Sequence, residues 1–298
     1  MNITNTEIKI EGRLVRMARV RHEGFEYLED PVAALAEIKQ SGERIDLFQF
    51  SQHLPNTTPQ YQYPMEMMNL AALPVNTHDE WFKKTIDGKT RNMVRKAEKK
   101  GIVVREVPFD DALVHGIWEI YNEVPVRQGR IFPHYGKDIE AVRKMSATFM
   151  SCSVFIGAYF EEKLIGFVKL TADQARSQAA IMHIVSMIKH RDKSPTNALM
   201  SESVRSCEKH GFPYLVYSNF AYGKKQQDTL ADFKVSNGFQ RIELPRYYVP
   251  LTALGKFALK TGLHRRFRDH LPEPLMDNFR KLRLAWYNRK FQSAEKTS

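Results

Sequence analysis

The sequence predicts a mixed β-sheet with helices packed on it, and the observations behind this prediction lie in residues 151–239. Residues 154–159 and 164–170 are apolar runs rich in β-branched and aromatic side chains. The three polar residues between them are typical of a β-hairpin. Two more strands and two helices are then expected to alternate, at 179–188, 194–211, 214–217 and 229–236. A hairpin joined to a strand–helix–strand–helix unit predicts a mixed sheet covered by helices.

The ends of these helices are marked by residues that favour helix termini. Ser194 and Pro195 predict a helix start, since serine is a common N-cap and proline is tolerated at the first helical position. Gly211 lies where a C-terminal cap is expected, and Asn237-Gly238 ends the second helix.

The remaining elements are shorter and follow hydrophobic periodicity. An edge strand is expected at 7–21, a helix at 31–40, and strands at 45–50, 67–75, 102–107 and 245–251. Residues 53–64 hold three prolines and are interpreted as an irregular surface connection or the lining of a cleft. A helix at 254–263 completes this part of the chain.

A capping box formed by Thr77 and Glu80 predicts the start of a helix that ends at Gly101. Arg91, Arg95 and Lys99 lie one turn apart on this helix and form a positive stripe. We expect Arg91 and Arg95 to bind phosphates or another anion. The alternative is an ordinary solvated helix face.

A polar loop follows the next helix, which Asp110 and Asp111 begin. Residues 121–136 combine hydrogen-bonding side chains with two prolines and two glycines, without periodicity. This composition is typical of a fixed loop that presents polar groups to a substrate, and an ordinary loop is the alternative. The candidate substrate-binding residues are Asn122, Glu123, Arg127, Gln128 and Tyr135, and His134 is the candidate base.

Composition limits the class of protein. With 298 residues and 43% apolar side chains, the chain can form a core of its own. Two cysteines do not support a disulfide framework or a cysteine metal site, and no apolar run is long enough for a transmembrane helix. We therefore expect a cytoplasmic protein without a bound metal. The net charge of +11 is concentrated after residue 251, where 11 basic residues face 4 acidic ones.

Two segments resemble a known family. Residues 91–101, Arg-Asn-Met-Val-Arg-Lys-Ala-Glu-Lys-Lys-Gly, resemble the FemAB signature in which a basic helix ends in Ala-x-Lys-x-Gly. Residues 230–239 resemble the Phe-Lys-x-x-x-Gly segment of the same family. The resemblance covers roughly residues 81–251 and implies the GNAT (acyl-CoA N-acyltransferase-like) fold, a mixed, mostly antiparallel sheet flanked by helices.

The FemAB resemblance implies transfer of an acyl or aminoacyl group to an amine on a peptidoglycan precursor or another envelope glycoconjugate. The best-known members carry two GNAT-like halves, whereas about 90 residues precede Arg91 here. The chain looks more like the shorter FemAB-related proteins associated with envelope polysaccharide biosynthesis. The expected organisation is an N-terminal partial α/β unit at 1–90, an acyltransferase domain at 91–251 and a basic helical tail at 252–298.

The resemblance also implies a place for the donor, between the fourth and fifth strands of the GNAT fold. Acyl-CoA is the expected co-substrate, and aminoacyl-tRNA is the alternative donor. Ser186, Lys189, Arg191 and Asn197 are the candidate cofactor-binding residues, because a basic segment stands where the family has a glycine-rich phosphate loop.

The catalytic candidates come from the Phe-Lys pair and from the end of the fifth strand. The resemblance implies that Lys234 stabilises developing negative charge near the transferred group. Tyr222 is the candidate acid for the leaving group, and Tyr217 and Ser218 are expected to contact substrate. The alternatives are a helix-surface lysine and packing aromatics. His183 lies in an apolar strand and is interpreted as a core histidine.

Two functional hypotheses remain open. The first is an N-acyltransferase or aminoacyltransferase acting on an amine of an envelope glycan or of its nucleotide- or lipid-linked precursor. The second is a non-catalytic GNAT-like module that binds an anionic glycan, a membrane surface or a nucleic acid. An amphipathic basic helix expected at 274–290 suits a peripheral position on an anionic membrane, and the alternative is a helix that packs its apolar face on the domain and exposes its charges to water. Nucleic acid is otherwise not expected as a partner, except for tRNA as donor.

Overall fold

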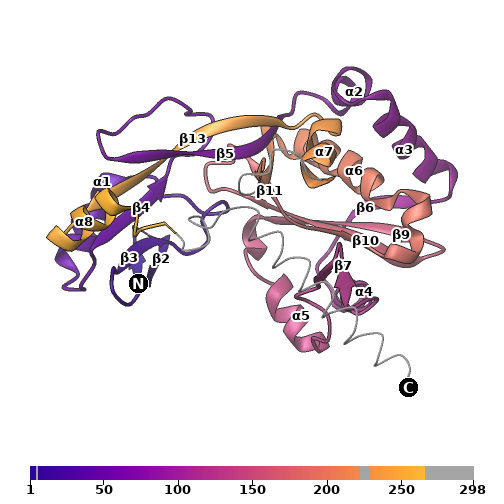
Figure 1. Ribbon diagram of the computed structural model, residues 1–298. Coiled ribbons are helices and arrows are strands. Elements are labelled where there is room, and N and C mark those ends of the chain that lie inside the picture. The colour runs from indigo at the N-terminus through magenta and orange to yellow at the C-terminus, as the bar shows by residue number, and fades with distance from the viewer. Residues whose placement is uncertain (5, 222–228, 266–298) are drawn as a thin grey trace. The chain divides into compact units, whose positions relative to one another are not determined.

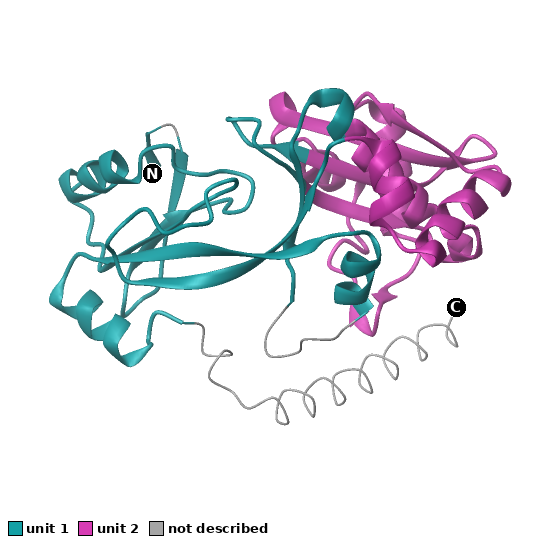
Figure 2. Ribbon diagram, turned by 90° about the horizontal axis from the view of Figure 1, so that it is seen from above, with its two compact units in different colours: residues 1–76, 171–180, 207–269 teal, residues 77–170, 181–206, 270–298 magenta. Residues whose placement is uncertain are grey.

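A computed structural model describes residues 1–4, 6–221 and 229–265 of the chain. The expected tail helix at 274–290 and the candidate acid Tyr222 lie outside the described residues. By internal contacts the chain divides into two compact units (Figure 2). Unit 1 comprises residues 1–76, 171–180 and 207–269, and unit 2 comprises 77–170, 181–206 and 270–298.

Unit 1 contains most of the N-terminal elements together with later ones (Figure 1). Its strands are β1 (Asn2–Ile3), β2 (Thr6–Glu11), β3 (Met17–Val20), β4 (Leu47–Ser51), β5 (Met65–Pro74), β12 (Tyr214–Asn219) and β13 (Gln240–Pro250). Its helices are α1 (Pro31–Gln40), α7 (Thr229–Ser236) and α8 (Ala253–Thr261). The strands lie in the order β1-β2-β3-β4-β13-β5-β12.

Unit 2 carries the helices of the middle of the chain. Its strands are β6 (Val103–Val107), β7 (Val126–Arg127), β8 (Arg130–Ile131) and β9 (Ser153–Phe160). Its helical segments are α2 (His78–Glu80), η1 (Trp81–Thr85), α3 (Gly88–Lys99), α4 (Asp111–Tyr121), α5 (Ile139–Ser146), η2 (Met150–Cys152) and η3 (Ile188–Lys193). Three elements pass from one unit to the other along the chain: β10 (Lys163–Ala172), β11 (Ala179–Ser186) and α6 (Pro195–His210).

The sheet is mixed and mostly antiparallel, with helices beside it, so the predicted fold class is confirmed. The described parallel pairs are β3 with β4 and β11 with β12. β13 has a central place in unit 1. It pairs with β5 over Gln240–Tyr247 and with β4 over Arg246–Pro250, antiparallel in both cases.

This pairing explains why the units are not consecutive segments. β5 comes from the N-terminal part of the chain, yet its neighbours on both sides, β12 and β13, come after residue 213. Backbone hydrogen bonds across a sheet join strands regardless of their distance in sequence. The contact units therefore interleave, whereas the sequence predicts the consecutive ranges 1–90, 91–251 and 252–298.

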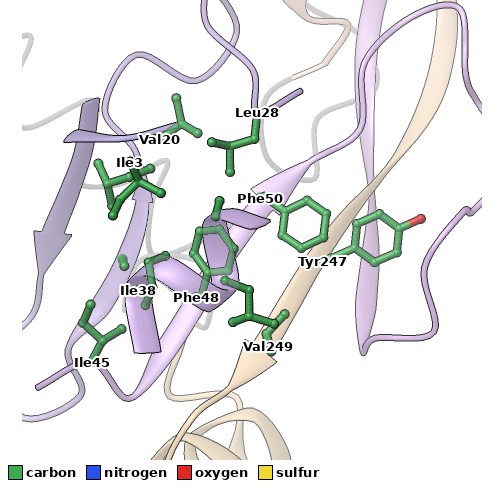
Figure 3. Packing of buried hydrophobic residues seen from close by; sticks show 13 residues of the cluster. Ile3, Val20, Leu28, Ile38, Ile45, Phe48, Phe50, Tyr247 and Val249 are labelled. Atoms are coloured by element: carbon green, nitrogen blue, oxygen red, sulfur yellow. The ribbon is translucent and has the colours of Figure 1, made fainter. Parts of the chain in front are cut away.

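The core of unit 1 is built on β4 and its neighbours (Figure 3). Phe48 and Phe50 point to this cluster together with Tyr247 and Val249 of β13 and Ile38 of α1. Phe50 stacks on Tyr247 with ring centroids 5.0 Å apart. The Tyr247 hydroxyl donates to Gln52 Oε1 at 2.9 Å, so this buried phenol has a hydrogen-bond partner, as buried polar groups require.

Three local predictions were wrong, each for a physical reason. The expected edge strand at 7–21 is two antiparallel strands, β2 and β3, because Gly12 turns the chain at φ +96°. The expected helix from Thr77 to Gly101 is interrupted. Thr77 does cap α2 through its side chain, but α3 begins anew where the Asp87 carboxylate accepts from the Thr90 N–H at 2.6 Å.

The third correction concerns the start of α6. Ser194 has a left-handed backbone, and its hydroxyl donates to Met93 Sδ at 3.3 Å instead of accepting from the first helical turn. Its carbonyl, not its side chain, accepts from the N–H groups of Asn197 and Ala198. Pro195 is the first helical residue, as predicted.

The hairpin prediction is confirmed. β9 and β10 are joined by Glu161 and Glu162, both with positive φ, which is the geometry of a two-residue type I′ turn. Helices α1 and α7 have the predicted bounds. In the described part of the chain, no helix is both long and apolar enough to cross a membrane.

Candidate functional site

Lys234 is buried in unit 1. Its side chain is fully enclosed, with 0% exposure, so the alternative of a helix-surface lysine is wrong. The ammonium group donates a hydrogen bond to the backbone carbonyl of Asn219. It also lies 4.9 Å from the ring centroid of Tyr217, within the range of a cation–π contact. A charged amine in this position is held between a carbonyl oxygen and an aromatic face.

The acceptor carbonyl lies where β12 departs from regular pairing. The register between β12 and β5 shifts between Val216 and Asn219, and Ser218 has φ +50°. The Ala221 N–H beyond it donates to the Asn69 side chain at 2.8 Å. β-Bulges of this kind redirect the backbone and are frequent beside functional sites. The bulge exposes Ser218 and presents the Asn219 carbonyl to Lys234.

The Phe-Lys-x-x-x-Gly segment is the C-terminal cap of α7. The Gly238 N–H donates to Val235 O at 2.9 Å, and the Phe239 N–H donates to Lys234 O at 3.0 Å. Gly238 has φ +84°, a conformation that glycine adopts without strain. The motif spacing therefore has a structural reason: the glycine ends the helix, and Phe239 is buried beside it.

A second polar cluster lies in unit 2, where Glu123 and Arg127 hold the polar loop. The Glu123 carboxylate accepts from the backbone N–H groups of Ile188 at 2.7 Å and Lys189 at 3.0 Å. Arg127 donates to Glu123, and also to the Ser186 carbonyl at 2.7 Å. These bonds tie the loop to the end of β11 and the start of η3. Both side chains were predicted to bind substrate, and both have partners within the protein.

Asn122 is also used internally. Its amide donates to Trp118 O at 3.0 Å, and its carbonyl accepts from the Gly136 N–H at 2.8 Å. The Asn122 side chain thus joins the start of the loop to its end at Gly136. Gln128, at φ +50° between β7 and β8, and Tyr135 are exposed to solvent. Of the predicted substrate-binding residues in this loop, these two face water.

His134 packs against aromatic rings in unit 2. It stacks on Tyr121 with centroids 4.5 Å apart and meets the edge of His183 at 5.6 Å. Burial lowers the pKa of His134 below its ordinary value, and the positive charge of Lys137 adds to this. His134 Nδ1 is buried without a hydrogen-bond partner among the described residues. A neutral imidazole at pH 7 has the lone pair that a general base needs.

His183 and Lys169 bring two more titratable groups to unit 2. Burial lowers the pKa of His183 to about 4, and the charges of His134 and Lys169 contribute to the same direction. His183 is therefore neutral at pH 7, and its side chain is half-buried.

Lys169 was missed by the sequence analysis. Its side chain has 0% exposure, and its ammonium donates to Ser146 O at 2.9 Å, to Thr148 O and to Thr148 Oγ1 at 3.0 Å. Burial lowers its pKa to about 8. The signal was present, because a lysine inside the apolar run 164–170 has to find acceptors when the strand is buried.

The expected cofactor-binding residues lie on β11, η3 and the start of α6. Ser186 Oγ and Thr196 Oγ1 are 2.8 Å apart, so Ser186 is bonded within the protein. Lys189 and Arg191 are exposed on η3, and Asn197 is half-buried in the first turn of α6. The exposed cations are the groups in this segment that can meet a phosphate. In the described ranges no three His, Cys, Asp or Glu side chains come together as metal ligands.

The predicted anion-binding pair on α3 separates in the structure. The Arg91 guanidinium donates to three backbone carbonyls, those of Phe82, Lys83 and Ile86, at 2.7–3.1 Å. It thereby closes the preceding π-helical turn. Arg95 points elsewhere, lies over the Phe82 ring at 5.5 Å, and lines a surface hollow.

Solved structures share this fold. The crystal structure of FemX matches with a TM-score of 0.60 over 80% of this chain and 83% of its own, at 10% identity. The C-terminal domain of a putative lysylphosphatidylglycerol synthetase from Agrobacterium fabrum matches at 0.55, over 87% and 86%, with 14% identity. L-PGS from Bacillus licheniformis matches at 0.52, over 85% and 83%, with 13% identity.

Sequence comparison adds no relative, since neither a protein-family model nor a curated protein matches the chain. At identities of 10–14% the structural likeness establishes the fold alone. The resemblance to FemAB-like proteins is confirmed at that level.

Proposed function

We propose that this protein is a transferase that moves an acyl or aminoacyl group from an activated donor to an amine. The acceptor is an envelope glycan or its nucleotide- or lipid-linked precursor. The observation that carries this proposal is the fold shared with FemX over four-fifths of the chain. A second neighbour is named for lysylphosphatidylglycerol, in which an aminoacyl group is attached to a phospholipid. Action on the cytoplasmic side of the membrane is part of this proposal.

The reaction forms a bond between the acceptor nitrogen and the donor carbonyl carbon, and breaks the carbonyl bond to a thiol sulfur or a ribose oxygen. The amine loses a proton, the leaving group gains one, and negative charge develops on the carbonyl oxygen in between. We assign stabilisation of that charge to Lys234, whose ammonium is already dehydrated in the folded protein. His134 is the proposed base, and Tyr222 is the proposed acid.

Two donors fit the proposal. Acyl-CoA would place its phosphates on the exposed cations Lys189 and Arg191, near the first turn of α6. Aminoacyl-tRNA would supply an ester instead of a thioester. Thermal-shift titrations with acetyl-CoA, longer acyl-CoAs, free coenzyme A and aminoacyl-tRNA separate the two donors, because a ligand that binds the folded state raises its stability. A shift by acyl-CoA and not by aminoacyl-tRNA identifies the first donor.

The transfer itself is tested with radiolabelled donors and a set of amino-sugar acceptors. Lys234→Met replaces the ammonium by an apolar chain of similar length, and Lys260→Met changes an exposed lysine on α8 as the matched control. We expect Lys234→Met to lose transfer by about 100-fold or more, the scale of removing one charge-stabilising donor. Circular dichroism checks that it stays folded. Full transfer by folded Lys234→Met would contradict the assigned role, and tyrosine-to-phenylalanine substitution at Tyr222 tests the acid separately.

A second function has one observation in its favour. Glu123 and Arg127 are hydrogen-bonded to each other and to nearby backbone groups, and Lys234 is bonded to a backbone carbonyl. Groups engaged in this way are typical of a scaffold as well as of a catalyst. A non-catalytic module would bind an anionic glycan, membrane or nucleic acid with no turnover from any donor. Product formation with either donor class excludes this alternative.

A further inference from the structure

The outer face of α3 carries cations that the rest of the protein leaves uncompensated. Residues 83–105 contain nine basic and two acidic residues. Three of the nine have partners nearby: Lys83 and Lys84 form ion pairs with Asp79 and Glu80, and Arg91 donates to backbone carbonyls.

Four of the other six cations lie together on the exposed side of α3. Thr90, Val94 and Ala97 are buried, which fixes the side that packs on unit 2. A hollow of about 390 Å³ lies on the exposed side, and its lining is Asn92, Arg95, Lys96, Lys99 and Lys100. We call these five residues the α3 surface. Within the described residues, none of its four cations forms an ion pair.

The close spacing of these four positive charges destabilises the helix that carries them. Arg95 and Lys99 are one turn apart, as are Lys96 and Lys100, and like charges at this spacing destabilise a helix. Lys99 and Lys100 gain from their position at the helix C-terminus, but Arg95 lies in the helix interior. Bound anions would remove the repulsion. Charge complementarity therefore indicates a ligand with several closely spaced negative charges.

The chemistry of the lining decides between two classes of polyanion. An anionic bilayer is bound by basic residues together with exposed apolar or aromatic side chains that enter the interface. The five residues of the α3 surface all carry polar or charged side chains, and Val94 of α3 is buried. A nucleic-acid backbone needs cations and amide donors without an apolar anchor, and Asn92 supplies the amide.

We propose that the α3 surface is a docking site for the phosphodiester backbone of an RNA. Arg95 is positioned for this by the Phe82 ring, which lies 5.5 Å below its guanidinium. Docking here is independent of base sequence, because backbone contacts carry no sequence information. The inference extends the version of the proposed function that uses an aminoacyl-RNA donor, and it rests on that version for its biological role.

Binding of a fluorescein-labelled tRNA transcript, measured by anisotropy, tests the proposal. One full-length variant carries Arg95→Gln, Lys96→Gln, Lys99→Gln and Lys100→Gln. The matched control loses the same charge from exposed lysines elsewhere, through Lys39→Gln, Lys144→Gln, Lys256→Gln and Lys260→Gln. We expect the first variant to bind at least about tenfold more weakly at about 50 mM salt. Its slope of log affinity against log salt should be shallower by about 3, the value for four lost phosphate contacts.

The control should keep the wild-type slope to within about one lost contact. Equal weakening of both variants would overturn the proposal, because net charge and not the α3 surface would then set the affinity. Loss of binding to phosphatidylglycerol vesicles with unchanged RNA binding would also overturn it, in favour of a membrane surface. These outcomes are read without turnover. Transfer from acyl-CoA together with unchanged RNA binding would refute the docking site and leave the transferase standing.

Discussion

The Glu123 carboxylate lies 3.0 Å from Nη2 of Arg127, and these two side chains keep 11% and 14% of their surface exposed. The same carboxylate accepts from two backbone N–H groups at the start of η3. Burial lowers the pKa of Arg127, and the Glu123 charge opposes that change. A nearly buried pair of this kind fixes the polar loop against β11, and its loss has a measurable cost.

Glu123→Ala should lower the free energy of unfolding by about 3 kcal/mol or more, because it leaves a buried guanidinium without its counter-charge. Urea denaturation measures this. Lys83→Ala is the control, since it breaks an i,i+4 pair whose members are about two-thirds exposed, and it should change stability by less than about 1 kcal/mol. Equal effects of the two substitutions would refute a structural role for Glu123.

The lowered pKa of Lys169 predicts that the free energy of unfolding rises with pH in the alkaline range. Burial lowers the pKa of Lys169 from its ordinary value of 10.5 to about 8 in the folded protein. Between these values the unfolded chain binds the extra proton, so stability increases as pH rises from 8 to 10.5. The gain should be at most about 3 kcal/mol. Lys169→Met should lack it, and the difference between the two urea-denaturation curves across this range isolates Lys169 from the other groups that titrate there.

The same substitution has a cost at neutral pH. Lys169→Met leaves the carbonyls of Ser146 and Thr148 without their donor, and each unsatisfied buried group costs about 1–3 kcal/mol. Part of this loss of stability is offset, because the variant no longer has to bury a charged group. A variant with the wild-type pH profile would show that Lys169 does not carry the alkaline effect.

The lowered pKa of His183 predicts how the free energy of unfolding changes with pH in the acid range. Its pKa is lowered from 6.5 to about 4, so between these values the unfolded chain takes up a proton that the folded protein excludes. Stability should therefore fall as pH drops from 6.5 to 4, by up to about 3 kcal/mol from this residue. His183→Phe keeps an aromatic ring and removes the titration. NMR titration of the wild-type imidazole gives an independent check, and a pKa near 6.5 would contradict the prediction.

Gly255 of α8 lies in a position that has no room for a larger side chain. A Cβ at this position would lie 1.9 Å from the Asp46 carbonyl oxygen, which is backbone and has little freedom to move. Gly255→Ala should therefore destabilise unit 1 by about 1–3 kcal/mol, as overpacking does. Gly88, the first residue of α3, has open space around its Cβ position. Gly88→Ala should be neutral or stabilising by up to about 1 kcal/mol, and thermal denaturation of both variants compares them.

Local chemistry in the sequence was enough to predict many elements. The bounds of α1 and α7 follow from Pro31 at a helix start and from Gly238 at a helix end. The hairpin of β9 and β10 follows from two apolar runs around a short polar turn. The division of residues 7–21 at Gly12 was missed, although a glycine among alternating residues is a turn signal.

Some features of the candidate residues could also be predicted from the sequence, and others could not. Lys234 came from a short motif, which the structure explains as a helix cap joined to a buried ammonium. Arg91 and Arg95 are equivalent in a helical pattern, yet one binds backbone carbonyls and the other lines a surface hollow. Spacing along a helix gives the direction of a side chain, whereas its partner depends on the preceding turn, which here is π-helical.

The sequence by itself determined the periodic and capping features, because these depend on neighbours within about four residues. It also determined the basic composition of α3 and the presence of a lysine within an apolar strand. Only the tertiary structure decided that β5 pairs with β12 and β13, that Lys169 meets the carbonyls of Ser146 and Thr148, and that Glu123 binds the start of η3. These contacts join residues from distant parts of the chain, and they form because buried polar groups must be paired wherever the fold brings a partner.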